Sequence, residues 1–454
     1  MTPAASTLIR TARLNSRRLA PLPQCSIAQQ IRLNSTFPAP SPLTTEQAET
    51  AATPPPPPLA KLSTQALLRG LLLHSVSASP ILLNTGTKFL LSQAPTIERN
   101  VPLKWAINQT FYSQYCSGTS EQEIRSTVTS LRSLGISGII LSYAREIELH
   151  DKPSQTTPSP STASDEISEF LSGTLKTISF TDPGDFIAIK YTGSGRTSIP
   201  LLHGSTPCTI HPHLGPALHE ICKAAKQKGV NILIDAEQSR VQEGIDNWTL
   251  SLMRQYNTRD QAVVYNTYQM YTRRSPGVLQ QHIALAEKEG WRLGVKLVRG
   301  AYLGSDPREA LWAEKEETDR CYNAALEYII SGAGTPGLFP DRANAESNKI
   351  DLMVATHNKD SIAAARGLEK REGVGRCTYA QLMGMADELS LGLVTSAKRG
   401  EVEVYKYAVW GSVEECVKYL VRRAMENRDA TGRSRENREA VWGELKRRWG
   451  LGSA

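Results

Sequence analysis

Two adjacent arginines near the C-terminus, Arg422 and Arg423, could hold a small carboxylate between two guanidinium groups. Arginine suits this task because its planar guanidinium donates two parallel, charge-assisted hydrogen bonds to a carboxylate. The surrounding residues 411–429 are predicted to form a helix, since Ser412 and Glu415 have the spacing of a capping box and apolar residues follow at helical spacing. An arginine pair on a helix is more often simply solvated, so the preceding elements must decide between these interpretations.

Eight short runs rich in β-branched residues precede this helix and alternate with stretches that suit helices. Most gaps between the runs hold about 10 to 20 helix-compatible residues, which is typical of repeated β-α units. Eight such units favour an α/β fold of the (β/α)8 TIM-barrel type over a doubly wound sheet, and no run is followed by a GxGxxG pattern. The predicted strands lie in residues 135–143, 185–191, 230–237, 262–269, 293–302, 350–358, 377–385 and 402–411.

Polar side chains cluster where these predicted strands end. Active sites of such barrels lie at the carboxyl ends of the strands, so these residues should meet in space. A single strand lysine has an ordinary explanation as an ion-paired residue, but together the set predicts a site. Its members are Glu146, Lys190, Asp235, Glu237, Asn266, Gln269, Lys296, Arg299, Thr356, His357, Gln381, Leu382 and Tyr407.

Six motifs occur in a fixed order along the chain: DAEQ, KLVRGAYL, ATHN, QLMGM, YKYAVWG and YLVRRAMEN. Through them, residues 65–430 resemble the proline dehydrogenase family in its single-function mitochondrial form. The resemblance implies a distorted (β/α)8 barrel that binds FAD non-covalently and oxidises L-proline to Δ1-pyrroline-5-carboxylate by hydride transfer to flavin N5. It also implies that the electrons pass to a membrane quinone.

The resemblance assigns the proline carboxylate to three cations, Lys190, Arg422 and Arg423. Glu146 matches a family glutamate that pairs with the first arginine of the doublet and helps to close the site over the substrate. Hydride transfer from the ring carbon next to the nitrogen requires the protein to favour the neutral form of the proline amine.

Five further residues are expected around the substrate ring. Tyr302, Leu382 and Tyr407 would form its walls, and a tyrosine at position 407 resembles the members that are specific for proline. Asp235 would brace the site as a catalytic residue. Lys296, the second expected catalytic residue, stands where bacterial relatives place an arginine beside flavin N5; lysine keeps the charge but loses the planar fork.

The remaining expected contacts bind FAD. Besides Lys296, the resemblance implies that Arg299, Gly300 and Ala301 contact the FAD phosphates and that Thr356 and His357 make a second contact with FAD. It also implies an amide at the flavin pyrimidine, assigned to Asn266 with Gln269 as its competitor, and a carboxylate near the ribityl chain, Glu426. Glycine at position 300 is interpreted as allowing the backbone to approach the ligand closely.

Residues 1–36 are predicted to be a mitochondrial transit peptide. The first 40 residues hold five arginines, and no acidic residue occurs before Glu46. A disordered basic tail is the alternative. Removing the five arginines reduces the net charge from +7 to +2, so the composition gives no reason to expect nucleic-acid binding. The location implied is the mitochondrial matrix, peripheral to the inner membrane.

The rest of the chain divides into four further parts. Residues 37–60 are a proline-rich linker, residues 61–134 a helical arm that should cover the side or bottom of the barrel, and residues 135–430 the FAD-binding barrel, with a surface insertion at 152–166. The basic tail, residues 431–454, could form an amphipathic helix on the inner mitochondrial membrane or pack back on the barrel.

Three rival functions remain open on the residues alone. Lys190 or Lys296 could form a Schiff base in an aldolase-like barrel, because a desolvated lysine suits that chemistry. A barrel without catalytic activity is the second rival, and a hydroxyproline dehydrogenase is the third. Seven cysteines without a CxxC pair give no sign of a metal site.

Overall fold

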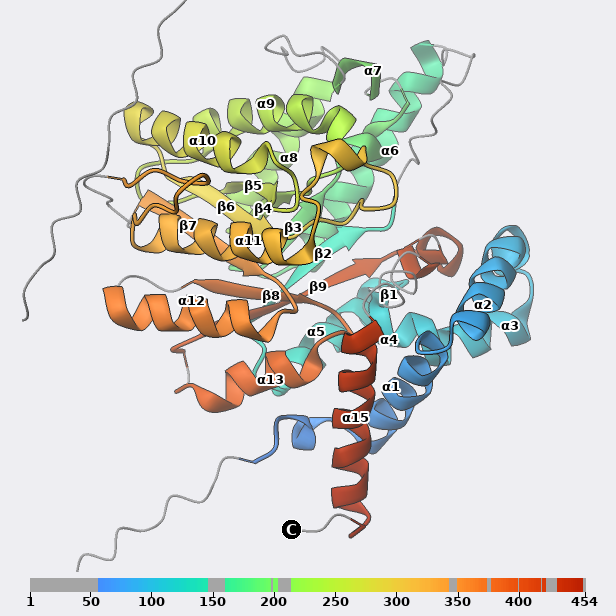
Figure 1. Ribbon diagram of the computed structural model, residues 1–454. Helices are drawn as coiled ribbons and strands as arrows, with labels where there is room; N and C mark the ends of the chain where they lie inside the picture. Colours follow the sequence, from blue (N-terminus) through green and yellow to red (C-terminus); the bar gives the residue numbers. More distant parts are fainter. Residues whose placement is uncertain are drawn as a thin grey trace, which may run out of the picture. The chain divides into compact units, whose positions relative to one another are not determined.

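The computed structural model describes residues 56–145, 160–196, 199–202, 214–342, 349–373, 377–398, 400–417, 419–421 and 431–451. Within them, eight parallel strands pair in sequence order, and the last also pairs with the first. The sheet therefore closes into a barrel, and the predicted fold class is confirmed (Figure 1). Each predicted run contains one barrel strand: β2 (Gly138–Tyr143), β3 (Phe186–Ile189), β4 (Asn231–Ile234), β5 (Val264–Gln269), β6 (Leu293–Val298), β7 (Ile350–Ala355), β8 (Thr378–Leu382) and β9 (Glu403–Trp410).

Helices follow the strands and surround the barrel (Figure 1). They bury apolar stripes against the outer face of the sheet, which explains why the parallel strands read as continuous apolar runs. The helices after β2 to β8 are α6 (Pro160–Phe180), α8 (Leu214–Lys228), α9 (Ser239–Tyr256), α10 (Ser275–Glu289), α11 (Lys315–Ile330), α12 (Lys359–Glu372) and α13 (Asp387–Ser396), with short turns at η4 (Tyr191–Ser194), α7 (Ile199–Leu202) and η5 (Arg308–Ala310).

The helix predicted after β9 begins as expected. Residues 413–417 and 419–421 are helical, Ser412 Oγ accepts a hydrogen bond from the Glu415 amide at 3.2 Å, and Glu415 Oε2 accepts one from the Ser412 amide at 2.7 Å. This reciprocal pair is the predicted capping box. The rest of the predicted helix, with Arg422 and Arg423, lies outside the described residues.

The predicted surface insertion at 152–166 is partly wrong. Helix α6 already begins at Pro160, and residues 146–159 lie outside the described part of the chain. Proline is tolerated in the first turn of a helix, and the buried Ile167 and Phe170 anchor the helix on the barrel. The first turns of α6 are therefore helical despite their low-complexity composition, because the rest of the helix packs on the barrel.

The amino-terminal half of the barrel interior is filled by three aromatic rings. Phe186 makes edge-to-face contacts with Tyr265 and Tyr405 at centroid distances of 5.4 and 5.1 Å. Gly294 lies beside Tyr265 in the sheet, and a Cβ atom there would stand 2.6 Å from the Tyr265 ring. These rings close the bottom of the barrel, so only its carboxyl half can hold a ligand.

The N-terminal elements pack at the side of the barrel beside β9. The short strand β1 pairs in parallel with the carboxyl end of β9, and the Tyr112 hydroxyl donates to the Gly411 carbonyl at 2.6 Å. Of the two expected positions, side or bottom, the structure shows the side. The elements are η1 (Pro58–Lys61), α1 (Thr64–Ser77), α2 (Pro80–Gln93), η2 (Ala94–Thr96), α3 (Val101–Ile107), η3 (Asn108–Tyr112), α4 (Ser113–Tyr115), β1 (Cys116–Gly118) and α5 (Glu121–Ser133).

The basic tail forms α15 (Thr431–Arg448), which lies beside α1 (Figure 1). Val441 and Leu445 are buried, and Arg448 donates to the carbonyls of Ala60 and Leu62 at 3.1 and 2.6 Å. The helix thus packs mainly on the N-terminal elements rather than on the barrel itself.

Candidate active site

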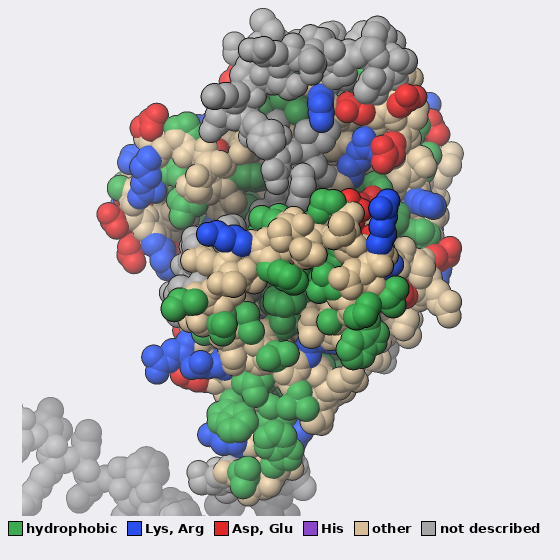
Figure 2. Space-filling view, turned by 90° about the vertical axis from the view of Figure 1, so that its right-hand side faces the viewer, with side chains coloured by type: hydrophobic (Ala, Val, Ile, Leu, Met, Phe, Trp, Pro, Cys, Tyr) green, Lys and Arg blue, Asp and Glu red, His purple; other side chains and the backbone are tan. Residues whose placement is uncertain are grey.

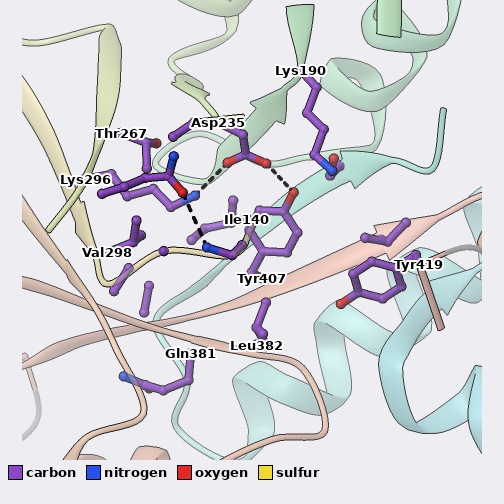
Figure 3. A pocket seen from close by; sticks show the side chains of 18 of the residues that line it. Ile140, Lys190, Asp235, Thr267, Lys296, Val298, Gln381, Leu382, Tyr407 and Tyr419 are labelled. Atoms are coloured by element: carbon purple, nitrogen blue, oxygen red, sulfur yellow. Dashed lines mark hydrogen bonds and ion pairs between the residues drawn. The ribbon is translucent and has the colours of Figure 1, made fainter. Parts of the chain in front are cut away.

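A cavity of about 260 Å³ opens at the carboxyl end of the barrel. Side chains from β2 to β9 and the loops after them line it (Figure 3). Thirteen of the residues predicted for the site share this lining: Lys190, Asp235, Gln269, Lys296, Arg299, Gly300, Ala301, Tyr302, Thr356, His357, Gln381, Leu382 and Tyr407.

Asp235 joins two other lining residues through hydrogen bonds. Its Oδ1 accepts from Lys296 Nζ and its Oδ2 accepts from the Tyr407 hydroxyl, both at 2.7 Å (Figure 3). Burial alone would raise the pKa of this carboxyl, but Lys296, the nearby Lys190 and the Tyr407 hydroxyl outweigh it and hold the pKa below its usual value. Asp235 is therefore an anion at neutral pH.

Tyr407 completes a three-residue cluster with Asp235 and Lys296. Burial and the Asp235 charge raise the pKa of the Tyr407 phenol well above its usual value, so the hydroxyl stays protonated and donates. Lys296 Nζ also lies 5.1 Å from the centroid of the Tyr407 ring, within cation–π distance. The three side chains come from β9, β6 and the end of β4, and each restrains the orientation of the others.

Arg299 is a second fixed cation at the end of β6. Its guanidinium donates to Asp319 at 2.8 Å, Thr356 Oγ1 at 2.6 Å and Ser361 Oγ at 2.9 Å, and it lies 4.5 Å from the Tyr322 ring centroid. These partners use donors on both edges of the guanidinium. Arg299 is thus pre-oriented as a positive wall of the cavity.

His357 follows the end of β7 and also lines the cavity. Its Nε2 accepts a hydrogen bond from the Leu382 amide at 3.1 Å, which requires that nitrogen to be unprotonated. The bond connects the ends of β7 and β8.

Asn266 does not line the cavity, so its prediction as a cofactor residue is corrected. Successive side chains of a strand point to opposite faces, and Thr267 and Gln269 of β5 take the inner face. Asn266 points to α9, where its amide donates to Asp246 at 3.0 Å. Gln269, the competing candidate, lies in the cavity wall and donates to the Glu237 carbonyl at 2.9 Å.

Gly300 lines the cavity, but its requirement for glycine has another cause than the expected approach to a ligand. Its φ is +153°, and a Cβ atom would stand 2.3 Å from the Tyr271 ring. Tyr271 donates to Asp306 at 2.5 Å, which fixes the ring in this position. Packing against Tyr271 alone therefore excludes a side chain at position 300.

A family model described as proline dehydrogenase matches residues 124–436. The chain belongs to the proline dehydrogenase family. It is 31% identical over 393 residues to a probable mitochondrial proline dehydrogenase of Schizosaccharomyces pombe, with 75% of this chain and 79% of the relative covered. It is 33% identical over 247 residues to mitochondrial proline dehydrogenase 1 of Homo sapiens, and there the match covers 51% of this chain and only 38% of the relative.

Solved structures of proline utilization A show the same fold as this proline dehydrogenase family member. The protein from Bdellovibrio bacteriovorus, inactivated by N-propargylglycine, superposes with a TM-score of 0.59 at 15% identity. The match covers 80% of this chain but 41% of that one, so the chain spans about two fifths of the larger protein.

Four residues expected in a proline dehydrogenase site cannot be placed, because Glu146, Arg422, Arg423 and Glu426 lie outside the described residues. Another lining residue, Tyr419, was not predicted (Figure 3). It stands three residues before Arg422, nearly one helical turn, so its position on the same helix face was a signal that the sequence contained.

Glu237 lies behind the cavity lining. It is buried outside the cavity lining, and its carboxylate accepts from the Thr192 amide at 3.1 Å and from the Thr192 hydroxyl. Thr192 lies in the turn after Lys190. Glu237 thereby positions the loop that presents Lys190.

The charges of the lining residues suit an anionic ligand. Among the described residues of the lining, four cations, Arg145, Lys190, Lys296 and Arg299, surround a single carboxylate, Asp235. Two of the cations have carboxylate partners behind the lining. The apolar walls between them suit a planar ring, and this donor set fits a flavin dinucleotide together with a small carboxylate substrate.

Proposed function

We propose that this chain oxidises L-proline to Δ1-pyrroline-5-carboxylate with non-covalently bound FAD and passes the electrons to a membrane quinone. The observation that carries the proposal is the Asp235, Lys296 and Tyr407 cluster in a predominantly cationic cavity at the carboxyl end of the barrel. The family match and the names of the relatives support proline as the substrate.

The proline carboxylate would bind Lys190 together with Arg422 and Arg423, with Glu146 pairing with the first arginine. The excess of cations around the cavity disfavours a protonated amine, so it favours the neutral amine from which a hydride can leave. Tyr407 presents its ring to the substrate while its hydroxyl is held by Asp235.

Another wall of the substrate site would come from two residues, Tyr302 after β6 and Leu382 at the end of β8, which line the same cavity. Together with Tyr407 they enclose a small ring and exclude water from the reacting carbon.

The cofactor would be held by lining residues at the ends of β5, β6 and β7. Bound FAD would supply the oxidising chemistry by taking up at N5 the hydride from the ring carbon next to the proline nitrogen. Lys296 holds a positive charge in this region, and Asp235 fixes its direction. The proposed contacts that line the cavity are Gln269, Lys296, Arg299, Gly300, Ala301, Thr356 and His357. Glu426 would lie near the ribityl chain.

Purified protein is expected to bind FAD that denaturation releases, and anaerobic L-proline should bleach its visible absorbance. Pyrrolidine should bleach the absorbance far more slowly, because it has no carboxylate for Lys190, Arg422 and Arg423 to bind. Faster bleaching by trans-4-hydroxy-L-proline would favour a hydroxyproline dehydrogenase. Folded protein that takes up no FAD, or that borohydride traps covalently with a carbonyl substrate, would contradict the proposal.

We also propose that the protein acts in mitochondria, at the matrix side of the inner membrane. The basic, acid-free N-terminal segment supports this, and several relatives are named mitochondrial. A reporter fused to residues 1–40 is expected to enter mitochondria, because the membrane potential draws in a cationic segment. The same fusion with its five arginines changed to glutamine should stay in the cytosol; import of that variant would contradict the proposal.

A further inference from the structure

The large apolar side chains that this protein exposes are concentrated on one group of helices. Figure 2 shows apolar side chains gathered over the face that these helices form. Of thirteen such side chains among the described residues, eleven lie on or beside α1, α2, α3 and α15. They are Leu68, Leu72, Ile81, Leu82, Phe89, Leu91, Val101, Trp105, Trp442, Trp449 and Leu451, and we call their surface the arm face.

Packing of the protein core does not account for this apolar surface. Helix α1 buries Leu73 and α2 buries Leu90 in the same cluster beside β9, yet Leu72 and Phe89 next to them are 52% and 49% exposed. Both helices are therefore apolar on two sides, and only one side packs on protein. A second apolar side that remains exposed indicates a second apolar environment.

The composition of α1 and α2 points to a membrane as that environment. No single described helix is long and apolar enough to span a bilayer, but Thr64–Ser77 and Ile81–Thr96 together have the length and composition of a span, as a pair bent by 101°. One side of each helix packs on the protein, so the exposed sides suit the surface of a bilayer rather than a span across it.

The charge around the arm face indicates the kind of bilayer. From residue 56 to residue 105 the chain holds five cations and one acidic residue, Glu98, which pairs with Lys104. Lys88 is exposed on α2, whereas Arg69 donates to Gln114 of the protein itself. Helix α15 adds six cations against three acids. Its Trp442 and the following Trp449 are partly exposed and stack edge to face at 6.1 Å, and tryptophan is favoured at the membrane interface.

We propose that the arm face docks on the surface of a bilayer that contains anionic lipids. The apolar side chains enter the interface, and the cations around them meet the lipid phosphates. A second copy of the chain is a poorer occupant, since pairing two cationic surfaces brings like charges together. The inference deepens the proposed function, because it names the surface by which the protein reaches a membrane acceptor, but lipid binding can be measured without turnover.

The test is cosedimentation of the full chain with vesicles. The protein is expected to bind vesicles of equimolar phosphatidylcholine and phosphatidylglycerol, to bind pure phosphatidylcholine more weakly, and to be partly released by salt. Ile81→Glu and Trp105→Glu should each lower the partition coefficient about 10-fold, because each removes one large apolar side chain from the interface. Lys88→Gln should reduce the preference for anionic vesicles.

The matched control is Leu201→Glu, which changes a 37% exposed leucine on α7, away from the arm face. It should leave vesicle binding unchanged. All variants should keep wild-type thermal stability, and proline oxidation with a soluble electron acceptor should also be unchanged, so a failure of the enzymatic proposal is seen separately. Absence of binding to anionic vesicles, or equal binding by wild type and both glutamate variants, would overturn the inference. A dimer that these variants dissociate, without vesicle binding, would assign the face to self-association instead.

Discussion

Replacement of Asp235 by alanine is expected to destabilise the fold by about 3 to 5 kcal/mol, because it leaves the buried Lys296 without its counter-charge. Both residues are less than a tenth exposed, and the Nζ to Oδ1 distance is 2.7 Å. The same change should lower kcat/KM for proline about 100-fold or more, since Lys296 and Tyr407 lose the group that orients them. Denaturant unfolding and steady-state kinetics measure the two effects.

Two further variants distinguish the effect of losing the Asp235–Lys296 ion pair from the effect of losing an ordinary hydrogen bond. Tyr407→Phe removes one hydrogen bond to Asp235 but no charge, and should cost about 0.5 to 1.5 kcal/mol of stability. The double variant Asp235→Ala/Lys296→Met should regain most of the lost stability, because a buried ion pair is often replaced by apolar groups without cost. It should regain no activity. If the Asp235→Ala variant is no less stable than the Tyr407→Phe variant, the Asp235–Lys296 ion pair does not contribute the predicted stability.

The pKa of Asp235 sets the pH dependence of this stabilisation. The folded-state pKa lies below its ordinary value of 3.8, so the folded protein binds fewer protons at this group than the unfolded chain does. The stabilisation is therefore complete above the ordinary value and is lost as the pH falls through the lower folded-state pKa. The free energy of unfolding of wild type relative to that of the double variant should be constant from neutral pH down to about 5 and should fall only in acid.

The barrel strands could be predicted because each is buried on both faces and reads as a short apolar run. Strand β1 was not predicted, because Cys116–Gly118 holds no β-branched residue and is extended only through its pairing with β9. The start of α6 was also not predicted, because it depends on contacts made elsewhere in the chain. Its serine- and threonine-rich first turns are helical because residues later in the helix pack on the barrel.

Position along a strand was enough to predict most of the cavity lining. The prediction was wrong at Asn266, whose side chain points away from the cavity. Side chains alternate along β5, and this alternation could have shown that Gln269 rather than Asn266 faces the inside of the barrel. The bond between Asp235 and Lys296 could not be predicted, because the residues are 61 positions apart and meet only after two further strand pairings. The sequence thus identified which residues share the cavity but not which of them bind one another.

Arg422→Met or Arg423→Met is expected to cost about 2 to 4 kcal/mol of proline binding, or about 30- to 1,000-fold in kcat/KM, through loss of a charge-assisted contact to the carboxylate. Methionine keeps an aliphatic stem and a high helix propensity, so the fold should persist. The Arg422 variant should also close poorly over substrate, because it loses the expected partner Glu146. Proline kinetics and thermal unfolding of both variants test this.

A matched control variant and a second substrate test whether Arg422 and Arg423 bind the proline carboxylate. Arg435→Met changes an exposed arginine that pairs with Glu439 on α15, and it should leave proline kinetics unchanged. Pyrrolidine lacks the carboxylate, so its slow oxidation should differ little between wild type and the two site variants, whereas that of proline should fall sharply. Equal losses with both substrates would mean that the arginines support the helix rather than the substrate. The helix that starts at the capping box of Ser412 and Glu415 and presents Tyr419 to the cavity would then contribute to the site through its packing alone.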